Sequence, residues 1–286
     1  MRGIVFENKK SIGINKLFWL LVPIFCILLV IFTINYNTIN CVVPRECLID
    51  NIISCTSNSC DVISSFTTDY SHSTPDRKHN IRLALKSLNG VVVKSGEEFS
   101  FNKVVGKRTE ERGYKKALVI FKGSYVEGVG GGVCQVSSTL YNAWLLAGLD
   151  TVSVKAHTLP SSYVDLSRDA TVSEYIDMVL FNPLESDVKI QTIYDENNIT
   201  INVLGQRREC EYSLKSETIE VLPFNEDIIE LDEVGEDEYF IGKVGYKSRL
   251  IITITKGGRV VAKRVLRNDY YIPQNSVKIL RKSAVN

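Results

Sequence analysis

Residues 130–142 read GGGVCQVSSTLYN, so three glycines stand almost directly before Cys134. Glycine lets the backbone adopt positive φ angles and approach other groups closely. Downstream, apolar residues recur with the spacing of one helix face; they are Val136, Leu140, Ala143, Trp144 and Ala147. The segment therefore predicts a glycine-rich turn that leads into a helix, with Cys134 at the helix start.

A cysteine in this position has a chemical advantage. The first N–H groups of a helix have no intrahelical partner and lie at the positive end of the helix dipole. That environment favours the thiolate, which is the nucleophilic form of cysteine. The same N–H groups can stabilise the oxyanion of an acyl-transfer reaction. Cys134 is therefore a candidate nucleophile.

A thiol nucleophile needs a base and a group that orients the base. The chain has three histidines, His72, His79 and His157. His157 follows the helix and one strand, and an antiparallel return would bring it back towards the helix start. Three carboxylates downstream are candidates to orient its imidazole: Asp165, Asp169 and Asp177.

Two other interpretations of the cysteine stay open. A lone cysteine beside a helix is often a small buried apolar residue. A glycine-rich turn before a helix can also bind phosphate, although this one lacks the Gly-Lys-Ser/Thr of a P-loop. The cysteines form no CxxC pair and have no nearby histidine, so we expect no metal site and no cofactor.

The N-terminal region predicts a membrane anchor. Leu17–Ile34 reads LFWLLVPIFCILLVIFTI and carries no charge, which suffices for a transmembrane helix. Four basic residues precede it and the next one after it is Arg45, so residues 1–16 are expected in the cytoplasm and the remainder outside. No A-x-A-like cleavage site follows the apolar run, which favours an uncleaved anchor over a signal peptide.

Composition limits the remaining possibilities. The chain has 286 residues, 44% hydrophobic and 23% charged, which suits one or two globular domains. A net charge of +1 gives no electrostatic reason to expect nucleic acid as a partner. Four cysteines lie just beyond the predicted anchor and either form two disulfides in a short stalk or stay unpaired; they are Cys41, Cys47, Cys55 and Cys60.

The pattern along the chain divides it into segments. Residues 35–64 are polar and indicate an extracellular stalk, residues 65–205 mix helices with strands, and residues 206–286 are rich in β-branched runs. A short helix ending at Asn89-Gly90 is expected from its apolar spacing. The strands expected before residue 206 are 91–93, 117–121, 151–155, 174–181, 188–194 and 199–204. Residues 250–255 and 260–266 predict a hairpin around Lys256-Gly-Gly-Arg259.

The segment from about Ser65 to Gly205 resembles the VanW-type domain, a family named for an accessory protein of glycopeptide resistance clusters. The resemblance rests on residues 77–114, on GVGGGVCQVSSTLYNAWLLAGL (128–149), and on AHTLPSSYV (156–164), RDATV (168–172) and DMVLFN (177–182). Ser138 stands where the family usually has threonine. The resemblance implies an α+β fold in which the glycine-rich loop leads into a helix packed on a mostly antiparallel sheet. Residues 206–286 are also faintly similar to a G5-type module.

Proteins of this family are exported, largely in Gram-positive bacteria, and some are L,D-transpeptidases that join peptidoglycan stem peptides by 3→3 cross-links. The resemblance implies Cys134 as nucleophile and His157 as general base and acid. Asp169 is the first choice for the orienting carboxylate, with Asp177 second. Two further roles are implied. The oxyanion region would be formed by Gly131, Gly132 and Gln135. A substrate carboxylate would be bound by Arg82 or Arg168.

Two alternatives to transpeptidation remain. The same acyl-enzyme could be attacked by water, which would make the protein a cysteine carboxypeptidase or endopeptidase of peptidoglycan. Alternatively, the domain binds cell-wall peptides without catalysis and Cys134 is structural. The choice between transfer and hydrolysis depends on pocket shape and on the exclusion of water, so both outcomes stay open at this point.

Overall fold

The computed structural model describes residues 61–121, 123–231 and 238–281. The predicted cytoplasmic segment, the anchor Leu17–Ile34 and nearly all of the stalk lie outside these residues. Within them, every helix is too short or too polar to cross a membrane.

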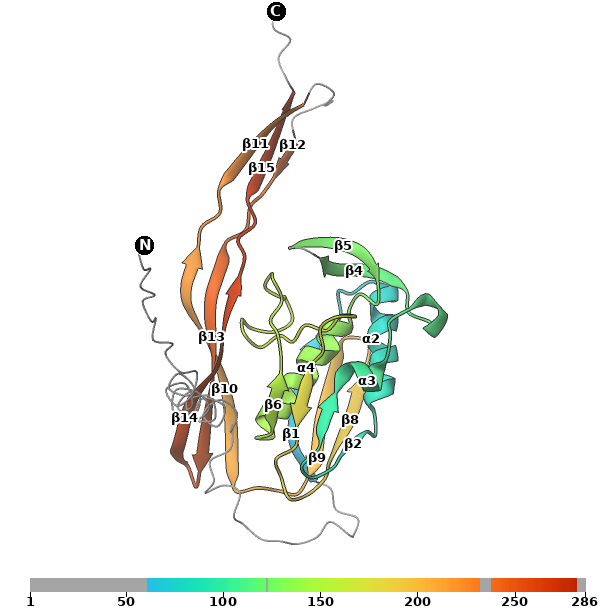
Figure 1. Ribbon diagram of the computed structural model, residues 1–286, viewed down its shortest axis with the longest axis vertical. Coiled ribbons are helices and arrows are strands. Elements are labelled where there is room, and N and C mark those ends of the chain that lie inside the picture. Colours follow the sequence, from blue (N-terminus) through green and yellow to red (C-terminus); the bar gives the residue numbers. More distant parts are fainter. Residues whose placement is uncertain (1–60, 122, 232–237, 282–286) are drawn as a thin grey trace, which may run out of the picture. The chain divides into compact units, whose positions relative to one another are not determined.

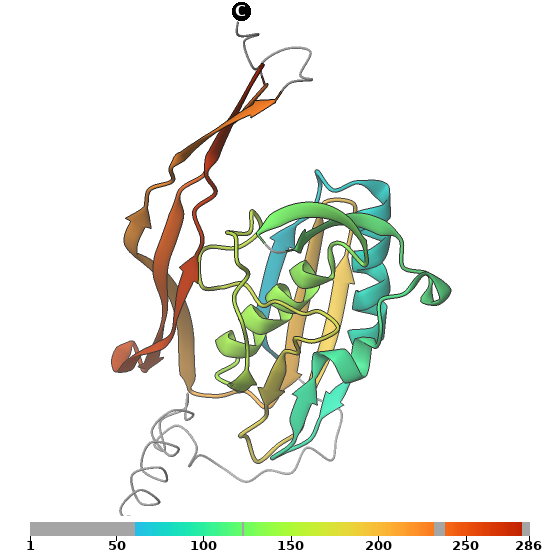
Figure 2. The same ribbon diagram turned by 45° about the horizontal axis from the view of Figure 1, so that its top comes forward.

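A four-stranded antiparallel sheet forms the base of the first half of the chain (Figure 1). Its order is β1 (Asp61–Asp69), β9 (Asn198–Gly205), β8 (Val188–Tyr194) and β2 (Val92–Val93). Helices α2 (Pro75–Leu88) and α4 (Val133–Leu146) pack on one face of this sheet, α4 against β1 and β9 and α2 against β8 (Figure 2). The fold is therefore α+β with mostly antiparallel strands, as expected.

Strand β1 joins the two ends of this region. Asp61 pairs with Gly205 and Asp69 pairs with Asn198, so the strand lies along the whole of β9. Residues 61–64, assigned to the stalk from sequence, are thus part of the sheet. Apolar and polar residues alternate only weakly along these positions, because β1 is an edge strand and Thr68 is the one side chain of β1 that is fully buried.

Both helices begin where their local sequence directs. Thr74 caps α2 by accepting a hydrogen bond from the Arg77 N–H, and Pro75 occupies the first turn, where proline is favoured. The helix therefore starts earlier than its apolar spacing alone indicated. Gly132 precedes α4 with a φ of 105°, which side-chain-bearing residues rarely adopt. The apolar face expected for α4 is buried, with Trp144 fully enclosed.

Smaller elements complete this region. They are β3 (Glu98–Ser100), α3 (Phe101–Val105), a 3₁₀ turn (Glu110–Arg112), the hairpin β4 (Lys116–Phe121) and β5 (Ser124–Val129), β6 (Asp150–Ser153) and β7 (Val179–Phe181). The strand expected over residues 174–181 is therefore wrong in its first half. There, Asp177 instead accepts hydrogen bonds from the Ser100 hydroxyl and the Asn102 N–H, which holds the start of α3.

Residues beyond 209 form two three-stranded sheets. The first is antiparallel, β10 (Cys210–Leu222), β13 (Gly245–Lys256) and β14 (Arg259–Tyr271). The second contains β11 (Glu226–Leu231), β15 (Ser276–Arg281) and β12 (Glu238–Phe240), with β11 parallel to β15. The predicted hairpin is confirmed as the β13–β14 pair, which turns through Gly257 and Gly258.

Asn80 fastens the glycine-rich turn to the rest of the fold. This fully buried side chain of α2 donates to the carbonyls of Lys115 and Gly131 at 2.9 and 3.0 Å, and accepts from the Lys115 N–H at 2.8 Å. A single amide thus ties α2 to the start of β4 and to the loop before Cys134.

We expect Asn80→Ala to lower the free energy of unfolding by about 1–3 kcal/mol, because it leaves buried backbone groups without partners. Chemical denaturation followed by circular dichroism measures the change. Lys86→Ala, an exposed change on the same helix, is the control and should stay within about 0.5 kcal/mol of wild type. Equal stability of the two variants would contradict the role assigned to Asn80.

Candidate active site

One face of α4 holds an irregular segment in place through side-chain hydrogen bonds. The Ser138 hydroxyl accepts from the Ala170 N–H at 2.9 Å, and the Ser137 hydroxyl donates to the Ala170 carbonyl at 2.6 Å. One turn further along, the Asn142 amide donates to the Arg168 carbonyl at 2.7 Å. Residues 168–172 therefore run along the helix although they form no strand. This contact brings Asp169 and its neighbours to the start of α4.

Another face of α4 binds the sheet. The Gln135 amide donates to the Thr68 hydroxyl at 3.1 Å and to the Asp69 carbonyl at 2.8 Å. Thr139 shares a 2.9 Å hydrogen bond with the same Thr68 hydroxyl. Both amide hydrogens of Gln135 are thus used by β1, so the structure places this residue in the core and not beside the thiol, where a side-chain oxyanion donor would have to lie.

Gly131 and Gly132 lie where the sequence expects them, directly before the cysteine. A Cβ atom on Gly131 would lie 2.7 Å from the carbonyl oxygens of Ala117 and Leu118, so only glycine allows β4 to pass this close. In the first turn, Val133 N–H donates to the Gly130 carbonyl and Gln135 N–H to the Gly132 carbonyl. The N–H of Cys134, between them, is the helix-start donor that these turn bonds do not use.

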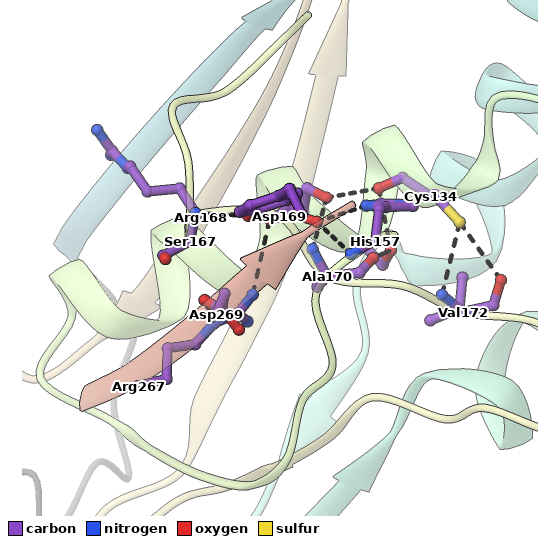
Figure 3. Close-up of polar contacts among 12 residues, drawn as sticks. Cys134, His157, Ser167, Arg168, Asp169, Ala170, Val172, Arg267 and Asp269 are labelled. Atoms are coloured by element: carbon purple, nitrogen blue, oxygen red, sulfur yellow. Dashed lines mark hydrogen bonds and ion pairs between the residues drawn. The ribbon is translucent and has the colours of Figure 1, made fainter. Parts of the chain in front are cut away.

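The Cys134 sulfur lies against the backbone of Val172. The Val172 amide nitrogen is 3.5 Å from Sγ and the Val172 carbonyl oxygen is 3.3 Å from Sγ. Figure 3 draws both contacts as dashed lines from the sulfur. Cys134 is a free, partly exposed cysteine, whereas Cys210 is disulfide-bonded. The thiol is therefore available for chemistry.

His157 and Asp169 form a buried pair next to this thiol (Figure 3). Oδ2 of Asp169 accepts from the His157 backbone N–H and pairs with His157 Nδ1, each at 2.6 Å. The imidazole also lies close enough to the Cys134 side chain for each group to shift the pKa of the other. Because Nδ1 is held by the carboxylate, Nε2 is the nitrogen left to face the sulfur. Three residues chosen from the sequence are thus brought together in the order thiol, imidazole, carboxylate.

The charges of these groups support one another. Burial opposes ionisation of the Cys134 thiol, but the hydrogen bond and positive charge of His157 outweigh it and lower the pKa of the thiol. Burial likewise disfavours the imidazolium, yet Asp169 and Cys134 raise the pKa of His157 to about 10. The pKa of Asp169 is lowered, since His157 and Arg267 outweigh its burial. The three shifts together favour a thiolate–imidazolium pair beside a carboxylate.

The second oxygen of Asp169 is held by the β-rich region. The Tyr271 hydroxyl donates to Oδ1. Arg267, labelled in Figure 3, has its Nη2 atom 3.6 Å from the same oxygen. Burial and the neighbouring carboxylate raise the pKa of Tyr271, so the hydroxyl stays protonated. The same hydroxyl accepts from the Ser167 N–H at 2.7 Å. Sequence analysis missed both residues, because nothing in the pattern of β14 separates Tyr271, which is buried, from the exposed Tyr270.

Several other candidates from sequence lie elsewhere. Arg82 pairs with Glu196 at 2.9 Å and with the Tyr70 hydroxyl. Arg168 donates to the Asn142 side chain at 2.7 Å and lies 3.5 Å from Asp165. Both arginines are thus engaged by protein groups. Asp177 caps α3, as described above, which leaves Asp169 as the carboxylate at the histidine.

The structure adds three residues near the sulfur that the sequence did not indicate. Arg77, Arg108 and Tyr163 all interact electrostatically with Cys134. They come from three separate segments, α2, the loop after α3 and the loop after β6, so no local motif connects them to the cysteine. A separate hollow, lined among others by Ser64 and Tyr212, lies at the far end of α4 and contains none of these residues.

The segment that contains the cysteine, histidine and aspartate of the site matches a known protein family. The family described as "VanW like protein" matches residues 76–204, a range that contains Cys134, His157 and Asp169. The chain contains a VanW-like domain. The resemblance expected from the sequence motifs is confirmed.

Two curated proteins are similar to parts of the chain. The chain is 50% identical over 111 residues to "Uncharacterized protein YoaR" of Bacillus subtilis, a match covering 39% of this chain and 37% of that protein. It is 28% identical over 194 residues to "Vancomycin B-type resistance protein VanW" of Enterococcus faecalis, covering 62% of this chain and 70% of that one. The chain thus aligns with little more than a third of the first relative.

Two solved structures resemble part of the chain. "Crystal structure of HP0197-G5" covers 24% of this chain and 96% of its own at 23% identity and a TM-score of 0.14. "IgA1 Protease G5 domain structure" covers 27% and 98% at 20% identity and a TM-score of 0.19. Both TM-scores are low, so the faint G5-like character of residues 206–286 stays an expectation.

The thiolate–imidazolium pair of the VanW-like domain predicts an unusual pH profile for alkylation. In wild type, Cys134 should react with iodoacetamide at pH values below the ordinary thiol range, because its lowered pKa keeps it ionised there. In His157→Gln the burial remains but the opposing cation is lost, so the onset of reaction should move to higher pH. Intact mass spectrometry at a series of pH values measures the rate. His79→Gln, at an exposed histidine, should leave the profile unchanged, and equal shifts in both variants would contradict the pairing.

The contact between Tyr271 and Asp169 predicts an effect from outside the VanW-like domain. Tyr271→Phe removes the donor to Asp169 and the acceptor for the buried Ser167 N–H, and should cost about 1–3 kcal/mol of stability. It should also slow alkylation at low pH, since Asp169 supports the imidazolium less well. Tyr270→Phe, the exposed neighbour on β14, is the matched control. An unchanged alkylation rate in Tyr271→Phe would remove Tyr271 from the site.

Proposed function

We propose that this protein is a membrane-anchored cysteine acyltransferase of the L,D-transpeptidase type, which forms 3→3 cross-links between peptidoglycan stem peptides. The observation that carries the proposal is the Cys134–His157–Asp169 arrangement, with a lowered thiol pKa and a raised imidazole pKa. A preformed thiolate beside an imidazolium is the arrangement that acyl transfer through a thioester requires.

The first half of the reaction uses the resting charges directly. The Cys134 thiolate attacks the carbonyl carbon of the third stem residue, and the resulting oxyanion forms at the helix start, within reach of the Cys134 N–H. Collapse breaks the peptide bond and leaves a thioester on Sγ. The departing amine of the terminal D-Ala takes the proton from His157 Nε2, which becomes neutral.

The second half reverses the proton transfer. The side-chain amine of an acceptor stem attacks the thioester, and neutral His157 removes its proton. Expulsion of the sulfur forms the new amide and restores the thiolate–imidazolium pair. Asp169 stays ionised throughout, because its lowered pKa reflects the donors around it; its part is to hold the imidazole with Nε2 towards the sulfur.

The proposed location is the outer face of the cell membrane, with residues 17–34 as a single-pass anchor. The apolar run and the basic residues before it support this orientation. The disulfide at Cys210 adds support, since disulfides persist in oxidising compartments outside the cytoplasm. The printed name of the Enterococcus faecalis relative, a vancomycin resistance protein, agrees with a role at the cell wall.

Hydrolysis is the main alternative outcome of the same chemistry. If water reaches the thioester before the acceptor amine, the protein is a carboxypeptidase or an endopeptidase. A purely binding role would not account for the lowered pKa of the thiol and the raised pKa of the imidazole. Because lowered thiol pKa values are a feature of reactive cysteines and not of buried structural ones, catalysis is the better supported function.

The full-length protein with muropeptides that carry tetrapeptide stems tests the proposal. Wild type should yield dimers with a 3→3 linkage, identified by mass spectrometry, and Cys134→Ala should yield none because no thioester can form. Shortened stems without dimers would change the assignment to a carboxypeptidase. If Cys134→Ala made dimers at the wild-type rate, the nucleophile assignment would be wrong; a thermal unfolding curve establishes that the variant is folded.

A further inference from the structure

The two arginines near Cys134 pack directly against the glycine-rich turn. A Cβ atom on Gly132 would lie 2.9 Å from Cγ of Arg77, and one on Gly130 would lie 2.8 Å from Cβ of Arg108. Both glycines also have a positive φ. The turn thus admits one arginine stem at each of two positions, immediately before the nucleophile.

These arginines have only neutral hydrogen-bond partners among the described residues. Arg77 donates to the Ser73 hydroxyl. Arg108 donates to the Asn102 side chain at 2.7 Å and to the Gly106 carbonyl at 3.1 Å. In residues 61–121, 123–231 and 238–281 no carboxylate forms an ion pair with either of them, in contrast to Arg82, Arg168 and Arg267.

The charged groups around the two arginines favour the binding of an anion. Burial lowers the pKa of both Arg77 and Arg108, which shows that their guanidinium groups have lost much of their hydration. The thiolate of Cys134 is already paired with the His157 imidazolium, whose other partner is Asp169. The groups that act electrostatically on Arg77 are Tyr163, Cys134 and Tyr125, none of them a carboxylate. Arg108 lies in addition in the field of Glu174 and of Asp177, which is already engaged at the start of α3. Both partly buried cations thus share the field of a thiolate that another cation already neutralises, and carboxylates lie near only one of them. Cations in such surroundings are costly unless an anion joins them.

We propose that Arg77 and Arg108 form a carboxylate-binding subsite, which takes the free C-terminal carboxylate of the donor peptide. The inference rests on the proposed function and makes its substrate class more specific. When the leaving group is the last residue of the peptide, its carboxylate lies one residue from the attacked carbonyl, and consecutive Cα atoms are only about 3.8 Å apart. The carboxylate of a bound donor peptide would therefore lie beside the two arginines.

The subsite explains how the protein chooses the peptide bond that it attacks. Guanidinium groups bind carboxylates through paired, charge-assisted hydrogen bonds. A stem that ends one residue after the attacked carbonyl presents its carboxylate to the arginines. A stem with a further residue presents an uncharged peptide group instead and leaves both cations unpaired. Attack is therefore directed to the last peptide bond of the donor.

The test compares two synthetic tetrapeptide stems ending in D-Ala, one with a free carboxylate and one with a carboxamide. Binding to full-length Cys134→Ala is measured by calorimetry, so that no reaction interferes. The acid should bind about tenfold more tightly or better, as expected for charge-assisted hydrogen bonds. Adding Arg77→Gln and Arg108→Gln should abolish the difference by weakening the acid alone. The corresponding lysine variants should restore part of it, and Arg82→Gln, whose arginine pairs with Glu196, should retain all of it.

Two results would overturn the subsite. One is equal binding of acid and amide. The other is a preference for the acid that survives both glutamine substitutions. This holds even if the same two substitutions alter the alkylation profile of a protein that retains Cys134, because such a change would show only an electrostatic effect on the thiol. These results are separable from failure of the proposed function. Selective binding of the acid without any thioester on wild-type Cys134 would reject the transpeptidase and leave the subsite standing, whereas dimers formed equally well from acid and amide donors would do the reverse.

Discussion

The buried carboxylate of Asp169 is the point on which the site depends. Its two oxygens accept from the backbone and the ring of His157 on one side and from Tyr271 on the other, with Arg267 close by. A carboxylate that is 1% exposed would be unstable without these donors. With them, it fixes the ring so that one nitrogen faces the sulfur and keeps the imidazole charged. The lowered pKa of the Cys134 thiol thus depends on the contacts of Asp169, which lies on the other side of the His157 ring from the sulfur.

The family signature can be understood as a description of α4. Its polar residues divide between two faces of the helix. Gln135 and Thr139 bind β1, whereas Ser137, Ser138 and Asn142 bind the irregular segment 168–172. A helix with so many buried polar groups is stable only because nearly every one has a partner. The threonine usually found at position 138 would keep the hydroxyl that binds Ala170, which explains why serine is a mild change there.

The sequence predicts the local features of the fold well and the long-range ones poorly. Apolar spacing located α2 and α4, and β-branched runs on either side of a glycine turn located the β13–β14 hairpin, because these signals are local in the sequence. The candidate nucleophile, histidine and carboxylate could be chosen from the sequence because thiol chemistry demands few residue types and the chain has few histidines. Arg77, Arg108 and Tyr271 were not, because they reach the site through tertiary packing and carry no local signal. Arg82 and Arg168 were chosen by residue type alone, and the structure gives each a protein partner instead.

The path of the chain gives the site an order of assembly. The three residues of the candidate site lie near the middle of the sequence, at Cys134, His157 and Asp169. Arg267 and Tyr271 follow about a hundred residues later, at the end of β14. A chain that is synthesised from its N-terminus presents the thiol first and the residues that hold Asp169 much later. Until β14 has paired with β13, the carboxylate lacks half of its donors and the histidine lacks a fixed support. The Cys134 thiol is therefore less strongly activated until β14 is in place. A fragment that ends before β14 would contain Cys134, His157 and Asp169 but would lack the Tyr271 and Arg267 contacts that hold Asp169.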